Sequence, residues 1–161
     1  MRHLEAIVFD FDGVIADCQN GVLLPRAAQF VHEAAGQCPL GIASGAVTRE
    51  IEGLLDQYNL RDAFAAIVGA DQAPRSKPAP DPYLEALHRI ERAGHRVTPA
   101  RSVAIDDSVW GLVAARTAQL RCVGVRPPGR TTNLAPHAEL IVSGLDELTL
   151  DMLVTLVSRD R

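Results

Sequence analysis

The chain has 161 residues, of which 47% are hydrophobic and 22% charged, and its formal net charge at pH 7 is -4. This length fits one domain with one substantial core, and the composition is typical of a globular protein rather than a disordered one. The acidic balance lacks the basic surface that nucleic acids and anionic membranes need. We therefore expect neither as a partner.

The cysteines and the amino-terminal segment bear on the compartment. Cys18, Cys38 and Cys122 are odd in number and show no C-x-x-C spacing, which is typical of free thiols in a reducing compartment. The segment from Met1 to Asp10 has Glu5 and Asp10 in and beside its apolar run, and no small-residue cleavage site follows, so it does not resemble a signal peptide. No apolar stretch approaches the roughly 20 residues of a membrane-spanning helix. We expect a cytoplasmic protein.

Short apolar runs alternate along the chain with segments of helical periodicity. The runs have the length of strands that are buried on both faces, and they cover residues 6–9, 39–43, 65–68, 103–105, 122–125 and 140–142. The periodic segments predict helices over residues 24–35, 48–58, 82–93, 109–118 and 148–157. Asp81, followed by a proline, and Ser108 are candidate helix caps. This alternation predicts an α/β fold in which a mostly parallel central sheet is covered by helices on both faces, as one domain over residues 1–161.

Two carboxylates, Asp10 and Asp12, follow the first predicted strand and precede Gly13. In an open α/β sheet the carboxyl ends of the strands are where ligands bind, so these side chains are candidates for an active site. The same pattern taken alone is equally typical of a turn, because aspartate favours turns.

Further along the chain, Ser44, Gly45 and Lys77 are candidates for binding a phosphate group. Ser44 and Gly45 follow the strand predicted at residues 39–43, where a hydroxyl and a glycine amide suit phosphate oxygens, although a helix cap would explain them as well. Lys77 lies in a loop with three prolines and is the only lysine of the chain. Because every other positive side chain of this kind is arginine, the compact ammonium group of Lys77 indicates a specific role.

Asp106 and Asp107 end another apolar strand. Neighbouring carboxylates repel one another unless a cation compensates them, so a pair that faces Asp10 and Asp12 predicts a site for a hard cation such as Mg²⁺. A helix cap formed by Asp107 and Ser108 is the alternative.

These signals occur in a fixed order along the chain, an acidic pair, a serine, a lysine and a second acidic pair. In this order the sequence resembles the haloacid dehalogenase superfamily, and within it the branch of β-phosphoglucomutase and phosphoglycolate phosphatase. The resemblance is carried by VFDFDGV at residues 8–14, IASG at 42–45, KPAPDPY at 77–83 and AIDDS at 104–108, with Gly111 and the pair Ala114 and Ala115. It implies a Rossmann-like core and an enzyme that hydrolyses a phosphate ester.

The resemblance also implies a role for each motif residue. Asp10 would attack phosphorus and form an aspartyl-phosphate, and Asp12 would act first as general acid and then as general base. Ser44, the Gly45 amide and Lys77 would hold the phosphoryl oxygens.

The cofactor that the resemblance implies is Mg²⁺. Its ligands would be the Asp10 carboxylate, the backbone carbonyl of Asp12 and a carboxylate of the second acidic pair. We assign Asp107 to the inner coordination shell, and Asp106 either to the same shell or to a contact through water.

The segment between Asp10 and Ser44 departs from this branch of the superfamily. Its members normally insert a helical cap domain here, which closes over the substrate. In this chain the predicted helix at 24–35 uses part of the segment, and residues 14–22 could form at most a short flap. We expect no cap domain, and hence an open site for a small phosphate ester or a larger phosphorylated substrate, or a homo-oligomer in which a second subunit covers the site.

Several alternatives stay open on the sequence alone. A phosphomutase shares every motif, but it must shield its aspartyl-phosphate from water, which an uncapped site does poorly. A catalytically weak binding protein descended from a phosphatase would also lack a cap. A receiver domain has its lysine after both acidic groups, whereas here Asp106 and Asp107 follow Lys77.

Arg49, just after the second motif, is either a substrate contact or an exposed side chain, and Gln119 stands where the family usually has glycine.

Overall fold

The computed structural model describes residues 3–160, and its main feature is a six-stranded parallel sheet with the order β5-β4-β1-β6-β7-β8. The strands are β1 (Ala6–Phe9), β4 (Leu40–Ala43), β5 (Ala66–Val68), β6 (Ser102–Asp106), β7 (Arg121–Val125) and β8 (Leu140–Val142). Every neighbouring pair in this sheet is parallel. The carboxyl ends of all six strands therefore meet at one edge, which confirms the predicted sheet.

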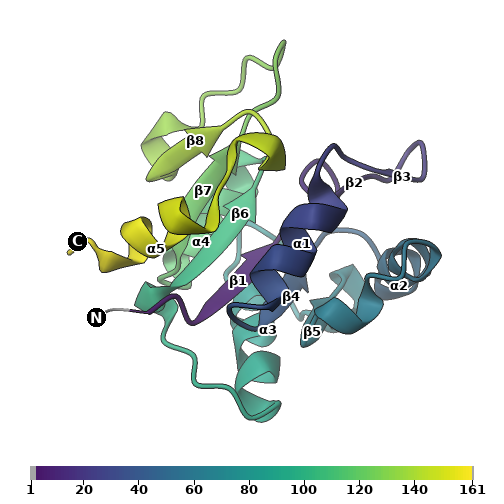
Figure 1. Ribbon diagram of the computed structural model, residues 1–161, viewed down its shortest axis with the longest axis horizontal. Coiled ribbons are helices and arrows are strands. Elements are labelled where there is room, and N and C mark those ends of the chain that lie inside the picture. Colours follow the sequence, from purple (N-terminus) through teal and green to yellow (C-terminus); the bar gives the residue numbers. More distant parts are fainter. Residues whose placement is uncertain (1–2, 161) are drawn as a thin grey trace.

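Within residues 3–160, five α-helices cover the two faces of the sheet. They are α1 (Ala27–Ala35), α2 (Thr48–Gln57), α3 (Asp81–Arg92), α4 (Val109–Thr117) and α5 (Leu150–Ser158). One apolar core joins α1, α2 and α5 to one face of the sheet, and a second core joins α3 and α4 to the other. Figure 1 shows α1 and α5 in front of the strands. The predicted arrangement, a central sheet with helices on both faces, is confirmed.

None of the helices within residues 3–160 has the length and apolar character that a membrane span requires.

Alternation along β6 decides where its last carboxylate points. Val103 and Ile105 belong to the core under α1, α2 and α5, whereas Ala104 belongs to the core under α3 and α4. Side chains two residues apart in a strand share a face. Asp106, which the prediction put after the strand, is the last residue of β6 and therefore faces α3.

The segment predicted as a flap forms a small hairpin. β2 (Ala16–Asp17) and β3 (Val22–Leu23) pair antiparallel, and Gly21 in the connecting turn has φ 64°. Glycine adopts this left-handed conformation without the steric cost of a Cβ atom. Residues 14–16 are buried in the core, whereas the turn of the hairpin and Val22 of β3 are exposed. α1 begins at Ala27 rather than at the predicted residue 24.

The helix ends partly follow the prediction. The Ser108 hydroxyl accepts a hydrogen bond from the Gly111 amide and caps α4. The prediction for Asp81 was wrong, because α3 begins at Asp81 itself and the Asp81 carboxylate pairs with Arg75. Gln119 follows the end of α4 with φ 69°, a conformation that glycine usually supplies after a helix.

Candidate active site

The carboxyl edge of the sheet carries a cavity of about 460 Å³. The sequence-predicted residues that line it are Asp10, Asp12, Ser44, Gly45, Lys77 and Asp107. Asp10 directly follows β1, and its amide donates to the Ile105 carbonyl of β6 at 2.8 Å. The acidic residues and the lysine come from segments far apart in the sequence, and the parallel sheet brings their side chains to one place.

Lys77 connects two carboxylates at the bottom of this cavity. Its Nζ atom donates to Asp10 Oδ1 at 3.2 Å and to Asp106 Oδ2 at 2.7 Å. An ammonium group has three donors, and these two contacts use two of them. The Lys77 side chain is 13% exposed, so a third donor can serve a group bound in the cavity.

Asp106 is fully buried below the cavity. Its Oδ1 atom accepts hydrogen bonds from the backbone amide and the hydroxyl of Ser108, each at 3.0 Å. Its Oδ2 atom accepts from Lys77 and from the Tyr83 hydroxyl, the latter at 2.6 Å. A carboxylate offers about four acceptor positions, and these four donors fill them.

Two glycines make room for the second acidic pair. A Cβ atom on Gly111 would lie 2.0 Å from Asp106 Oδ2, and one on Gly13 would lie 2.1 Å from Asp107 Oδ2. Real Cβ atoms do not approach so closely, so any side chain at either position would displace a carboxylate. Both residues belong to the sequence motifs, and in the structure each has a steric reason to be glycine.

The charges in the cavity perturb one another strongly. Burial, and then the negative charges of Asp106 and Asp107, raise the pKa of Asp10 well above its ordinary value, although Lys77 opposes this. Burial also raises the pKa of Asp107. For Lys77, burial alone would lower the pKa, but the charges of Asp10 and Asp106 outweigh it and raise the pKa. Without a further cation, the surroundings of Asp10 thus oppose the charged form of its carboxyl group.

The carboxylates fit a hard divalent cation. Asp10, Asp106 and Asp107 each offer an oxygen, and these oxygens lie within 4.8 Å of one another. Oxygen ligands are those that Mg²⁺ prefers, and its charge would relieve the repulsion that raises the Asp10 pKa. Asp106 lies close enough, but its acceptor positions are already filled, so Asp10 and Asp107 are the better placed carboxylates.

Asp12 lies on the solvent side of the cavity. Its carboxylate is exposed, and its Oδ1 atom accepts a hydrogen bond from the backbone amide of Cys18 at 2.9 Å. Cys18 belongs to the turn of the hairpin, so that turn holds Asp12 at the entrance. The side chain of Asp12 is not part of the carboxylate cluster, which leaves it available for proton transfer.

Ser44 and Gly45 form the wall opposite the second acidic pair. Ser44 is buried at the end of β4, and its hydroxyl accepts from the Ala46 amide at 3.1 Å. Gly45 is exposed and borders open space. Ser44 does not cap α2, because that helix begins only at Thr48, whose amide donates to the Asp71 carboxylate. The helix-cap alternative for Ser44 is therefore wrong.

A sequence-family model for haloacid dehalogenase-like hydrolases matches residues 5–119, which is more than half of the chain. The chain belongs to this family. Hexitol phosphatase B of Escherichia coli strain K12 is 33% identical over 125 residues, which make up 74% of this chain and 54% of that protein. The chain thus spans about half the length of this curated relative.

Solved structures of haloacid dehalogenase-like proteins share the fold. The crystal structure of CbbY from Rhodobacter sphaeroides in complex with phosphate has a TM-score of 0.77 and 22% identity, and the match covers 90% of this chain and 96% of that one. β-Phosphoglucomutase from Clostridium difficile has a TM-score of 0.81 and 17% identity, with 96% of this chain and 97% of that chain covered. At these identities the likeness concerns the fold alone.

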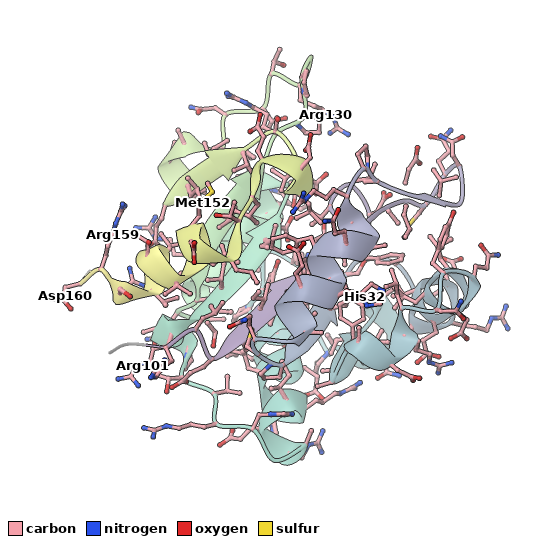
Figure 2. All side chains as sticks on the ribbon, viewed as in Figure 1. His32, Arg101, Arg130, Met152, Arg159 and Asp160 are labelled. Carbon is pink, nitrogen blue, oxygen red and sulfur yellow. The ribbon has the colours of Figure 1, made fainter. Side chains whose placement is uncertain are left out.

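In this member of the haloacid dehalogenase-like family, two residues near the cavity were given no role by the sequence prediction. Tyr83 contacts Asp106, and the charge of Arg130, on the loop after β7, acts on Asp107. Figure 2 shows Arg130 on that loop and the exposed His32 on α1. Arg49 is exposed, and it does not line the cavity. An aromatic residue in a helical turn gives no sign of a polar role, and loop conformations leave no periodic signal.

Proposed function

We propose that this chain hydrolyses phosphate monoesters with Mg²⁺, through a covalent phosphate on Asp10. The observation that carries the proposal is the convergence of Asp10 with Lys77 and Asp107 in one cavity at the carboxyl edge of the sheet. An anionic nucleophile can approach an anionic ester only where positive charge surrounds both. Lys77 supplies part of that charge, and the carboxylate cluster supplies a place for the rest.

The first step would transfer the phosphoryl group to Asp10. A carboxylate oxygen of Asp10 forms a bond to phosphorus while the bond from phosphorus to the ester oxygen breaks. Asp12 gives its proton to the departing oxygen, which leaves as an alcohol. Lys77, the Ser44 hydroxyl and the Gly45 amide hold the non-bridging oxygens during the transfer.

The second step would return Asp10 to its free state. Asp12, now a carboxylate, takes a proton from a water molecule, and that water attacks the phosphorus of the aspartyl-phosphate. The bond between phosphorus and Asp10 breaks, and inorganic phosphate leaves. The exposed position of Asp12 supports this role, because both the departing alcohol and the incoming water must reach it.

The ligands that we propose for Mg²⁺ are the Asp10 and Asp107 carboxylates and the backbone carbonyl of Asp12. When bound, the ion would offset the repulsion between the ester and Asp10 and would polarise the phosphoryl oxygens. We place Asp106 outside the inner shell, since its acceptor positions are taken by Ser108, Lys77 and Tyr83.

The surroundings of the cavity bear on the substrate. Between Asp10 and Ser44 the chain forms the β2–β3 hairpin and α1, and we propose that it works without a cap domain inserted there. An open site gives water access to the aspartyl-phosphate, which favours hydrolysis over transfer within a sugar phosphate. The similarity to hexitol phosphatase B supports small phosphorylated polyols and sugars as the first substrates to try.

The decisive experiment is a phosphate-release assay with an activated aryl phosphate and a panel of sugar and polyol phosphates. We expect release in Mg²⁺, none in EDTA, and a loss of at least about 10³-fold in Asp10→Asn, because the nucleophile is gone. Asp62→Asn changes an exposed aspartate remote from the cavity and should match the wild type. Equal turnover by the wild type and Asp10→Asn would contradict the proposal. An isomerised sugar phosphate in place of free phosphate would instead favour a phosphomutase.

A further inference from the structure

The hydroxyl of Tyr83 has no role in the chemistry described so far. Tyr83 lies in the first turn of α3 and is fully buried. Its hydroxyl donates to Asp106 Oδ2 at 2.6 Å, and the same oxygen accepts from Lys77 Nζ at 2.7 Å. The Lys77 ammonium also lies 5.1 Å from the centre of the Tyr83 ring. Tyr83 therefore contacts both members of the Lys77–Asp106 ion pair.

Packing alone does not require this hydroxyl. A phenylalanine ring would fill nearly the same volume in the core under α3 and α4, which otherwise consists of aliphatic side chains and Cys122. A buried hydroxyl costs free energy unless it is hydrogen-bonded, and here the partner is a charged carboxylate. The chain thus places a polar group at a position where an apolar one would fit.

The shared acceptor affects how tightly Asp106 holds the ammonium group. If Lys77 were the only donor to Oδ2, the full attraction of the buried carboxylate would draw Lys77 toward Asp106. Because the hydroxyl of Tyr83 also donates to Oδ2, it neutralises part of the negative charge there and weakens the pull on Lys77. The Tyr83 ring limits movement of the ammonium on one side. Lys77 can then keep its 3.2 Å contact with Asp10 and present its third donor to the cavity.

We infer that Tyr83 is a positioning residue that acts through Asp106 to hold the Lys77 ammonium between Asp10 and the phosphoryl group. The inference deepens the proposed function and rests on it for its catalytic consequence. It assigns a role to the tyrosine at the end of the KPAPDPY segment that core packing does not provide.

The first test compares Tyr83→Phe with Tyr58→Phe, which removes the hydroxyl of the other, partly exposed tyrosine. We expect Tyr83→Phe to lower kcat about tenfold and to raise the inhibition constant of inorganic phosphate about tenfold, since one charge-assisted contact is weakened. Its thermal unfolding should stay within a few degrees of the wild type. Tyr58→Phe should change none of these quantities. Unchanged kcat and phosphate inhibition in Tyr83→Phe would overturn the inference.

A double-mutant cycle separates positioning from a general structural effect. If Tyr83 acts only through Asp106, Asp106→Asn combined with Tyr83→Phe should be no slower than Asp106→Asn alone. Losses that multiply in the double variant would show that Tyr83 acts by another route and would contradict the inference.

A third measurement does not depend on turnover. Because Lys77 is the only lysine, protein labelled with ¹⁵N-lysine gives one side-chain Nζ signal in an NMR spectrum. We expect Tyr83→Phe to shift or broaden that signal and Tyr58→Phe to leave it in place. A superimposable Nζ signal in Tyr83→Phe would overturn the inference even for an inactive protein. Absence of any phosphatase activity in the wild type, with the Nζ signal shifted as expected, would contradict the proposed function alone.

Discussion

The bottom and the entrance of the cavity are built in different ways. We call Asp10, Lys77, Asp106 and Tyr83 the floor, where all the groups are wholly or largely buried and each bonds to another member. We call Asp12 and Cys18 the mouth, where both residues are exposed and the Cys18 amide donates a hydrogen bond to Asp12.

This difference suggests a division of labour. A floor of buried, mutually bonded charges is organised before any ligand arrives, which suits the part of the reaction that every phosphate ester shares. The mouth is exposed and has few contacts, so it can adapt to different leaving groups. Changes in the floor should therefore affect all substrates alike, and changes in the mouth should depend on the leaving group.

After the loss of the nucleophile in Asp10→Asn, the largest effect that we predict concerns Lys77. Lys77→Arg keeps the charge, but a planar guanidinium cannot occupy the place of a compact ammonium between Asp10 and Asp106. We expect kcat/KM to fall by about 10²–10³-fold for every ester tested, which is the usual cost of a lost transition-state donor. Arg75→Lys, an exchange of the same kind at an exposed position of the same loop, should be near neutral. A loss restricted to some leaving groups would break the distinction between floor and mouth.

The second prediction concerns the proton on Asp12. For Asp12→Asn we expect kcat/KM to fall about 10²-fold or more with an alkyl phosphate, whose leaving oxygen needs a proton. With p-nitrophenyl phosphate the loss should be about tenfold or less, because its phenolate leaves unprotonated. The value of kcat/KM reports the first irreversible step and so excludes the later attack by water. Asp17→Asn, in the hairpin beside Cys18, is the control, and equal losses with both esters would assign Asp12 to the floor.

Most of the floor could be predicted from the sequence, but not the contact that Tyr83 makes beneath it. Apolar runs placed β1, β4 and β6 correctly, and parallel topology then required Asp10, Ser44 and the second acidic pair to meet. The contact between Tyr83 and Asp106 was not predictable, because an aromatic residue in the first turn of a helix is usually part of the core. The hairpin amide that holds Asp12 was missed for a different reason, since backbone groups leave no trace in side-chain patterns.

The third prediction concerns pH, and it uses the raised pKa of Asp10. Because the folded protein binds this proton more tightly than the unfolded chain, the metal-free protein should lose stability as pH rises from the ordinary carboxyl pKa, about 4, to the raised value. Mg²⁺ competes with the proton, so its stabilising effect should grow with pH over the same window. At about 100 times its Kd the expected stabilisation is about 2.7 kcal/mol.

Thermal unfolding in EDTA and in Mg²⁺, measured across that range of pH, tests this expectation. In Asp10→Asn the buried charge is gone, so the part of the pH slope due to Asp10 should vanish in EDTA. Stabilisation by Mg²⁺ that is independent of pH in the wild type would show that Asp10 does not bind the ion.

The smallest effect is predicted for Cys18, the thiol of the mouth. Burial, and then the nearby charge of Asp12, raise the pKa of the Cys18 thiol to about 12, so it stays protonated at neutral pH although the residue is exposed. A thiol in this state is a poor nucleophile. We expect iodoacetamide to modify Cys18 more slowly than free cysteine. We expect Cys18→Ser to change kcat/KM less than twofold, because the backbone amide keeps its hydrogen bond to Asp12 and a serine hydroxyl can replace the hydrogen bond of the thiol. Fast alkylation of Cys18, together with a large loss of kcat/KM in Cys18→Ser, would mean that the mouth contributes a reactive thiol. The chemistry could then no longer be assigned to the floor and Asp12 alone.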